Sequence, residues 1–268
     1  MKRMSLLLAL LAATTAAQAQ SGTLQVRVDG AVQRPSVFQV PTGTRLAEVL
    51  LAAMPTEAAY PTGAALLRPS ALEAQTRLKA GVLHDLQALQ SAVDVQPATA
   101  AAAARLEAEL AAMPVTGRVR NELAARVVEV RPETNLVLQP GDHVLYPTRP
   151  TQVRVTGAVA APCTLPHAPL RDAVEYLHDC PAAAADGDLL FAVQPDGTVQ
   201  TLGIAAWNRS PHQALAPGAT LYVPLPERDL RRAGTPDLNR ELADFLATQP
   251  IAPLPAHAPD TSNTDPAP

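Results

Sequence analysis

An internal repeat sets the strongest limit on how this chain can fold. Residues Gln25 to Pro35 align with Gln152 to Pro162 at a constant offset of 127, and eight of the eleven aligned pairs are identical. In both copies valines alternate with other residues up to a Gly-Ala pair, a pattern that predicts a strand, a turn and a second strand after the proline. Repetition of this kind is typical of a duplicated structural unit. We therefore expect two copies of one small β-rich domain.

Each copy should continue into a short helix and close on a strand. We expect Thr44 to cap the first of these helices. The apolar residues at helical spacing are Leu46, Val49 and Leu50 in the first copy and Leu170, Val174 and Leu177 in the second. A Leu-x-Pro-Gly turn then precedes each closing strand, at His143 to Tyr146 and at Thr220 to Val223.

The difference in length between the copies predicts an insert in the first one. The first copy spans 123 residues, from 25 to 147, and the second spans 73, from 152 to 224. We place the additional residues, about fifty, at roughly 55–113. One apolar stripe in this segment consists of Leu78, Val82, Leu86, Leu89 and Val93.

This stripe indicates a helix capped by Ser70 and ended by Pro97, followed by a second helix from Ala98 to Met113. Two such helices would form an antiparallel hairpin. The stripe can either dock on its own β domain, which we favour, or form a groove for a partner.

The first nineteen residues are typical of a cleaved signal peptide. Lys2 and Arg3 precede an apolar run, Ser5 to Ala13, that is too short for a hydrocarbon core of ~30 Å, and Ala17-Gln18-Ala19 offers small residues for cleavage. We therefore expect a periplasmic protein with no membrane-spanning segment in the mature chain.

Cys163 and Cys180 are the only cysteines of the chain. In an oxidising compartment a disulfide is the expected state, and the nearby His167 and His178 do not have the spacing of a standard zinc site. On the chain-entropy model the disulfide would stabilise the fold by ~3 kcal/mol. We expect no metal and no cofactor.

Composition argues against nucleic acid as a partner. The formal net charge is -4, and aromatic residues make up 3% of the chain. A phosphate backbone would find no basic stripe, and bases or sugars would find few aromatic surfaces. The only tryptophan, Trp207, follows a hairpin predicted at Phe191 to Gln200, and we place it in the core rather than in a ligand platform.

The C-terminal section departs from the repeat. Residues Asp237 to Thr248 predict an amphipathic helix. Its apolar face consists of Leu238, Leu242, Phe245 and Leu246, and its polar face of Asn239, Arg240, Glu241 and Asp244. About twelve residues rise only ~18 Å, which is short of a bilayer core. This helix should dock on protein, and residues 250–268 indicate a flexible tail.

The order of these features resembles that of a known family. The paired Gly-Ala-Val openings and Leu-x-Pro-Gly closings resemble soluble-ligand-binding β-grasp (SLBB) domains of outer-membrane polysaccharide exporters. Together with the helical insert, Pro114 to Val119 and Trp207-Asn208-Arg209, they resemble the GfcC family of capsule biosynthesis proteins up to about Phe245. The resemblance implies an α+β fold of two tandem β-grasp domains, with boundaries at 20–150, 151–226 and 227–249, the last being a linker and the amphipathic helix.

The resemblance also implies a function. It predicts a monomeric, non-enzymatic accessory of capsule or exopolysaccharide assembly that binds polysaccharide or an outer-membrane export protein. The alternative is a pure protein-interaction factor that docks on an export channel through its helical insert or C-terminal helix.

One residue is implied as a ligand contact. Arg118 matches the arginine of the family that lines a cavity beside the first domain, and its guanidinium suits carboxylates, phosphates and sugar hydroxyls. A structural ion pair with Glu122 or Glu129 is the other interpretation, and the sequence leaves both open. No catalytic motif is present, although four acidic residues of a possible glycosidase are not excluded by sequence: Asp142, Glu175, Asp186 and Asp188.

Overall fold

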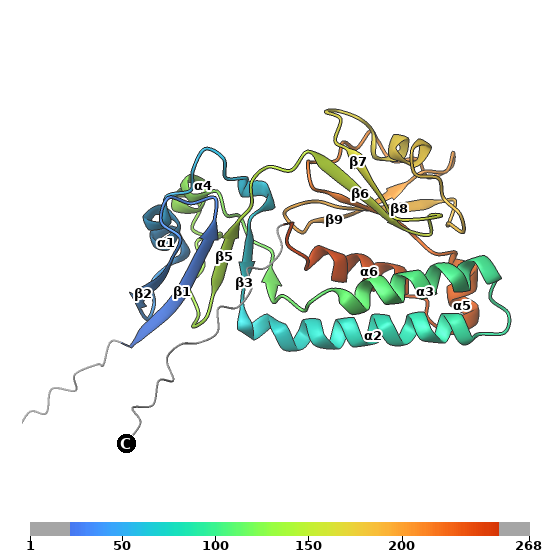
Figure 1. Cartoon of the computed structure of the whole chain (residues 1–268), viewed down its shortest axis with the longest axis horizontal. Coiled ribbons are helices and arrows are strands. Elements are labelled where there is room, and N and C mark those ends of the chain that lie inside the picture. The colour runs from blue at the N-terminus through green and yellow to red at the C-terminus, as the bar shows by residue number, and fades with distance from the viewer. Residues whose placement is uncertain (1–21, 252–268) are drawn as a thin grey trace, which may run out of the picture.

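The computed structural model describes residues 22–251. The predicted signal peptide at 1–19 and residues 252–268 of the predicted tail lie outside the described residues. The chain forms a mixed α+β structure of two domains, each built on a five-stranded sheet (Figure 1). Within the described range no helix is both long and apolar enough to cross a bilayer.

The two sheets have the same topology. The strands of the first are β1 (Thr23–Gly30), β2 (Ser36–Pro41), β3 (Ala65–Leu67), β4 (Arg118–Val119) and β5 (His143–Tyr146). Those of the second are β6 (Gln152–Gly157), β7 (Cys163–Pro166), β8 (Leu189–Val193), β9 (Val199–Gly203) and β10 (Thr220–Val223). Their orders are β2-β1-β5-β3-β4 and β7-β6-β10-β8-β9. In each, only the pairing of the first and closing strands is parallel, so the duplication, the closing strands and the predicted hairpin are confirmed.

Helices occupy the connections. The α-helices are α1 (Leu46–Ala53), α2 (Leu72–Ser91), α3 (Pro97–Ala112), α4 (Ala125–Val130), α5 (Glu227–Ala233) and α6 (Leu238–Ala247). The short 3-10 helices are η1 (Pro61–Gly63), η2 (Pro69–Ala71) and η3 (Ala173–His178).

The first core lies between one face of the first sheet and α1. Val26 and Val28 of β1 meet Leu46 and Leu50 of α1, and all four are fully buried. The expected cap at Thr44 is wrong, because the helix begins one residue later. There the backbone N–H of Arg45 donates to Glu48 Oε1 at 3.1 Å.

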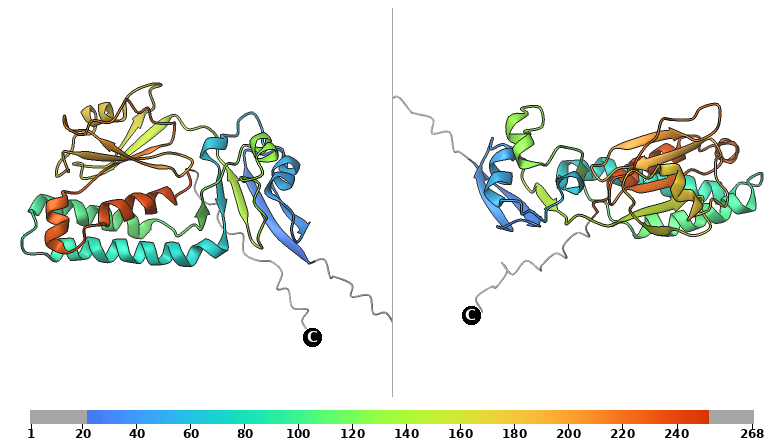
Figure 2. Two further views of the ribbon diagram at one scale, coloured as in Figure 1. Left: turned by 180° about the vertical axis from the view of Figure 1, so that it is seen from behind. Right: turned by 90° about the horizontal axis from the view of Figure 1, so that it is seen from above.

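The helical hairpin of the insert packs on the second domain, which corrects the expectation that it docks on its own. The buried stripe of α2, at Val82, Leu86 and Leu89, belongs to the same apolar core as Val155 of β6 and Phe245 of α6. Figures 1 and 2 show α2, α3, α5 and α6 together beneath one face of the second sheet, with η3 on the opposite side. The insert therefore joins the two domains.

The ends of the hairpin helices also differ from the prediction. Ser70 does not cap α2, since its hydroxyl donates to Gln139. Val93 lies beyond the end of α2 and is 98% exposed. Pro97 begins α3 instead of ending α2, because a proline at the first helical position loses no intrahelical hydrogen bond.

The predicted helix of the second copy is only the short η3. Leu170 was expected on its apolar face, but it precedes η3, has a φ of 60° and is 81% exposed. Val174 and Leu177 do pack against the second core. With so short a helix on one face, the second sheet gains most of its cover from the hairpin on the other.

Two side chains were assigned to the wrong environment. Trp207 is 77% exposed, so its placement in the core is wrong. Asn239 of α6 was expected on the polar face but is buried, where its Oδ1 accepts from Tyr222 Oη at 2.7 Å and from Leu225 N at 2.9 Å. The side-chain amide of Asn239 therefore provides hydrogen-bond partners for the backbone of Leu225, where the chain leaves the sheet after β10.

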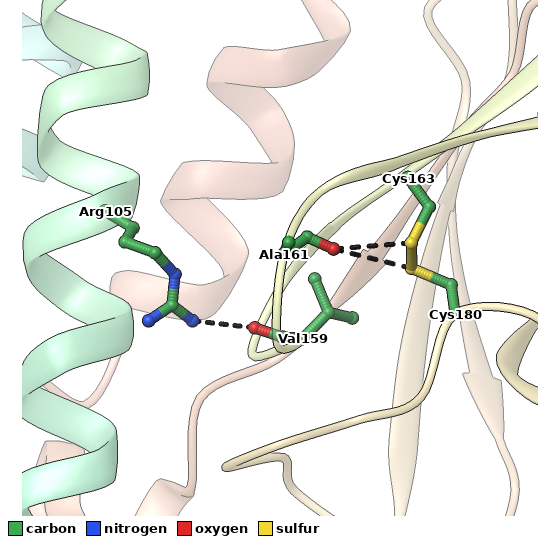
Figure 3. Close-up of a disulfide and its surroundings, with 5 residues drawn as sticks. All are labelled: Arg105, Val159, Ala161, Cys163 and Cys180. Atoms are coloured by element: carbon green, nitrogen blue, oxygen red, sulfur yellow. Dashed lines mark hydrogen bonds between the residues drawn. A yellow bond between two sulfur atoms is a disulfide. The ribbon is translucent and has the colours of Figure 1, made fainter.

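Cys163 and Cys180 form the expected disulfide, with Cα atoms 6.1 Å apart (Figure 3). It ties β7 to the chain that follows η3. Nearby, Arg105 of α3 donates to the carbonyl oxygen of Val159 at 2.7 Å, so the insert also fixes the turn between β6 and β7.

Acidic side chains gather where α2 packs against α6. Burial raises the pKa of Glu241, and the negative charges of Asp85, Asp237 and Asp244 raise it further. The pKa of Asp85 is also raised by burial and by Asp237, and lowered by His84. Burial raises the pKa of Asp244, which Arg240 opposes.

Leu86→Ala should destabilise the second domain although Leu86 belongs to the insert of the first. The substitution removes a fully buried side chain from the second core, and we expect a loss of roughly 2–5 kcal/mol in the free energy of unfolding. Urea denaturation measures the loss, and hydrogen exchange should locate it in β6–β10. The control Val93→Ala should be nearly neutral, and exchange that rises in the first sheet alone would contradict the packing described.

Glu241→Gln should stabilise the protein at pH 7 by up to about 1 kcal/mol. The folded-state pKa of Glu241 is raised, so its charged form is penalised above that pKa, and the gain should vanish below about pH 4, where the carboxyl is protonated in both states. Thermal melts from pH 3 to 8 test this, with the exposed Glu133→Gln as charge-matched control. A gain that persists at pH 3 would refute the electrostatic explanation.

Candidate functional site

The segment from Thr116 to Arg118 lies where the two domains meet. Gln75 of α2 holds it by two hydrogen bonds of 2.8 Å, accepting from Gly117 N and donating to Arg118 O. Gly117 has a φ of +72°, and a Cβ there would come within 2.6 Å of the carbonyl oxygen of Arg68. Only glycine fits this position without strain, so β4 pairs with β3 in one register.

The guanidinium of Arg118 connects three parts of the fold. It donates to the carbonyl oxygens of Ala64 in the first domain, Pro195 in the β8–β9 turn, and Ala247 and Gln249 at the end of α6. These four contacts use the N–H groups of both terminal nitrogens. A cation at the C-terminal end of a helix is also favoured by the helix dipole.

No carboxylate neutralises Arg118 within ion-pair distance in the described part of the chain. Burial lowers the pKa of Arg118 to about 10, and the charge of Asp196 acts in the opposite direction, so the group is still a cation at neutral pH. The proposed ion pairs are therefore wrong. Glu122 accepts from the backbone N–H groups of Leu123 and Ala124, and Glu129 pairs with an arginine of its own helix.

Three cavities adjoin this junction. The first-sheet cleft has about 490 Å³ and is bounded by Gln25, Arg27, Val37, Leu67, Leu72 and His143, among others. The second-sheet cleft has about 350 Å³ and is bounded by Gln152, Arg154, Thr164, Val193, Thr220 and Leu246, together with Arg118. A third, of about 340 Å³, lies beside Arg118 and Arg120.

Two of the four acidic residues considered for catalysis, Asp142 and Asp186, accept hydrogen bonds that hold the fold. Asp142 is fully buried and accepts from Arg68 at 2.9 and 2.7 Å and from Gln139 N at 2.8 Å. Asp186 accepts from the backbone of Asp188, and Glu175 lies on η3 of the second domain. Among residues 22–251 no group of three His, Cys, Asp or Glu side chains could hold a metal ion.

The sequence pointed to Arg118 but not to the residues that position it and accept its hydrogen bonds. Gln75 is a polar residue within an amphipathic helix and carries no local signal of burial. The carbonyl oxygens of Ala64 and Pro195 belong to the backbone and cannot be chosen by residue type.

Comparisons with known proteins cover nearly all of the described chain. The family described as capsule biosynthesis GfcC, N-terminal, matches residues 20–150, and capsule biosynthesis GfcC C-terminal matches residues 161–251. The chain is also 33% identical over 188 residues to the uncharacterized protein YjbG of Escherichia coli (strain K12), covering 67% of this chain and 74% of that protein.

Arg118→Met should lower the free energy of unfolding by roughly 2–5 kcal/mol, because four carbonyl groups lose their donor at a buried junction. The stability of Arg118→Lys should lie between those of Arg118→Met and the wild type, since an ammonium group has three donors and cannot span the same four oxygens. Chemical denaturation measures both. The exposed Arg120→Met is the control and should change stability by less than about 0.5 kcal/mol. Equal stability of Arg118→Met and the wild type would disprove the structural role.

Proposed function

Because this chain belongs to the GfcC family of capsule biosynthesis proteins, we propose that it is an exported, non-enzymatic accessory of capsule or exopolysaccharide assembly that binds the polysaccharide. Membership of the family supports a role in capsule biosynthesis. The binding of polysaccharide is our inference from which surfaces of the molecule are buried and which are accessible.

We infer that both domains are β-grasp domains, of the SLBB kind, with the boundaries given above. Each begins with an antiparallel strand pair, continues through a helical segment, and returns its closing strand parallel to and beside the first. This arrangement and the shared order of strands support the assignment.

Export to the periplasm is supported by two independent features. The N-terminal residues have the pattern of a signal peptide, and a structural disulfide such as that between Cys163 and Cys180 is typical of proteins in an oxidising compartment and rare in the cytosol. We propose that the mature protein acts as a monomer without a cofactor.

Polysaccharide binding is favoured by one observation: the apolar faces of α2, α3 and α6 are already packed within the protein and are not free to bind a partner. The alternative requires the insert or the C-terminal helix to dock on an export channel. The buried apolar stripes of α2, α3 and α6 all belong to the core of the second domain. Docking through them would require the core to open, whereas the clefts on the sheet faces are accessible in the folded molecule. Binding of polysaccharide is therefore favoured over docking by helices.

Arg118 has two roles in the proposed function. It holds the two domains together, and its charge gives the neighbouring cavities a positive potential. Both of its terminal nitrogens are occupied by backbone oxygens, so it offers little hydrogen bonding to a ligand. Its charge, which no carboxylate of the described residues pairs with directly, still favours an anionic ligand in the second-sheet cleft and in the third cavity.

Deletion of the gene in the producing strain should reduce surface polysaccharide, and the full-length chain should restore it. A version lacking residues 2–19 should not restore it, because it would remain in the cytoplasm. Extraction and uronic acid or total sugar assays of the cell surface measure the effect. The purified protein should leave the chain length of the polysaccharide unchanged in gel filtration. Unaltered surface polysaccharide in the deletion strain would refute the proposed role, and shortened chains would refute the non-enzymatic assignment.

A further inference from the structure

The first-sheet cleft and the second-sheet cleft are two copies of one site. Arg27 of β1 is paired with Val37 of β2 and His143 of β5. Arg154 of β6 is paired in the same way with Thr164 of β7 and Thr220 of β10. All six residues line their respective clefts, as do Gln25 and Gln152, two positions before each arginine. The repeat therefore places a Gln-x-Arg pair on the same face of each sheet.

The two arginines are presented alike. The side chain of Arg27 is 40% exposed and that of Arg154 is 39% exposed. Each guanidinium contacts one carboxylate, and within residues 22–251 its other N–H groups make no further hydrogen bond. The arrangement thus offers donors on the arginine and acceptors on the carboxylate beside an exposed amide, a combination that suits the hydroxyls and carboxylates of sugars.

The carboxylates come from different parts of the chain. In the first domain it is Asp29, two residues along the same strand, which contacts Arg27 and lies 2.9 Å from His143 Nε2. In the second domain the corresponding residue is Thr156, and the carboxylate is supplied by Glu109 of α3, 2.6 Å from Arg154 and 3.0 Å from Thr156 Oγ1. Both domains therefore hold an arginine beside a carboxylate at the same position of the sheet, although the carboxylate comes from a different element in each. This indicates that the arginine has a role in the cleft.

The clefts also lie on either side of one segment. Val115 and Thr116 line the first-sheet cleft, and Met113 and Arg118 line the second-sheet cleft. Volumes of about 490 and 350 Å³ are within the range of small-ligand sites. The segment from Met113 to Arg118 therefore contributes to the walls of both clefts.

We propose that the two clefts form a duplicated site for units of an acidic polysaccharide, with Arg27 and Arg154 as the paired anchors. This rests on the proposed function, and it adds where the polymer binds and why the domain is duplicated. A repeating ligand matches a repeated site, because once one unit is bound the second binds at a high effective concentration.

The test uses the acidic surface polysaccharide of the producing strain, purified by anion exchange and cut into fractions of one repeat unit and of about ten. Calorimetry on the mature protein should show that the long fraction binds at least about tenfold more tightly than the short one. Arg27→Met and Arg154→Met should each remove most of this advantage, and the double variant should abolish binding.

Three controls keep the result interpretable. Arg126→Met removes an exposed arginine that is also paired with a glutamate, in α4, and should leave binding unchanged. Gln25→Ala and Gln152→Ala leave both ion pairs intact and should weaken binding of the long fraction, which guards against loss of folding in the arginine variants. Circular dichroism verifies the fold of each variant.

Absence of binding to the acidic long fraction, affinity independent of length, or full affinity in the double variant would overturn the inference. Introducing the same variants into the deletion strain separates it from the proposed function. If deletion abolishes surface polysaccharide while the double variant restores it fully, the accessory role stands and the duplicated site fails. If deletion has no effect, the accessory role itself fails whatever the binding data.

Discussion

A buried guanidinium that forms no ion pair within residues 22–251 is the interaction on which the arrangement of the two domains depends. Removing a charge from water is costly, and Arg118 offsets that cost with backbone carbonyl oxygens instead of a carboxylate. Carbonyl groups are fixed by the fold around them. Arg118 is therefore satisfied only when the first domain, the β8–β9 turn and the end of α6 are all in place. This makes the junction cooperative, since each part completes the hydrogen bonding of the others.

The helical hairpin extends the same dependence over a larger surface. One face of the second sheet carries only the short 3-10 helix η3. The opposite face is covered by α2 and α3, although these helices are encoded within the first domain. Covalent continuity between one domain and the core of the other limits how far the two can move apart. The clefts on the two sheets are thereby held at a fixed spacing, which a flexible linker between tandem domains would not provide.

The sequence predicted those features that local patterns determine. Alternating valines predicted β1 and β6, and the Pro-Gly turns placed β5 and β10 with their correct ends. Helical spacing located α2 and α3 within a few residues. What the sequence could not predict depends on contacts between distant segments. An apolar stripe such as Val82, Leu86 and Leu89 states that a face is buried but not against which sheet. Trp207 was placed by the average behaviour of tryptophan. Its loop is instead held at the surface by Asn208, whose side chain accepts from Ala205 N and donates to the carbonyl oxygen of Asp188. Arg118 was identified, but its partners are backbone atoms, which have no residue type to recognise.

The divergence between the copies at one position explains why the two sheet faces are used differently. Asp29 provides Arg27 with a carboxylate from its own strand, so the first sheet needs no helix to satisfy that charge, and its face can remain open to solvent. Thr156 has no charge to offer, and Arg154 therefore depends on Glu109, which reaches it only when α3 is docked. Position 156 thus links the electrostatics of the second cleft to the packing of the insert. A carboxylate at position 156 would repel Glu109 and so oppose the docking of α3, in addition to removing the hydrogen bond that Thr156 donates.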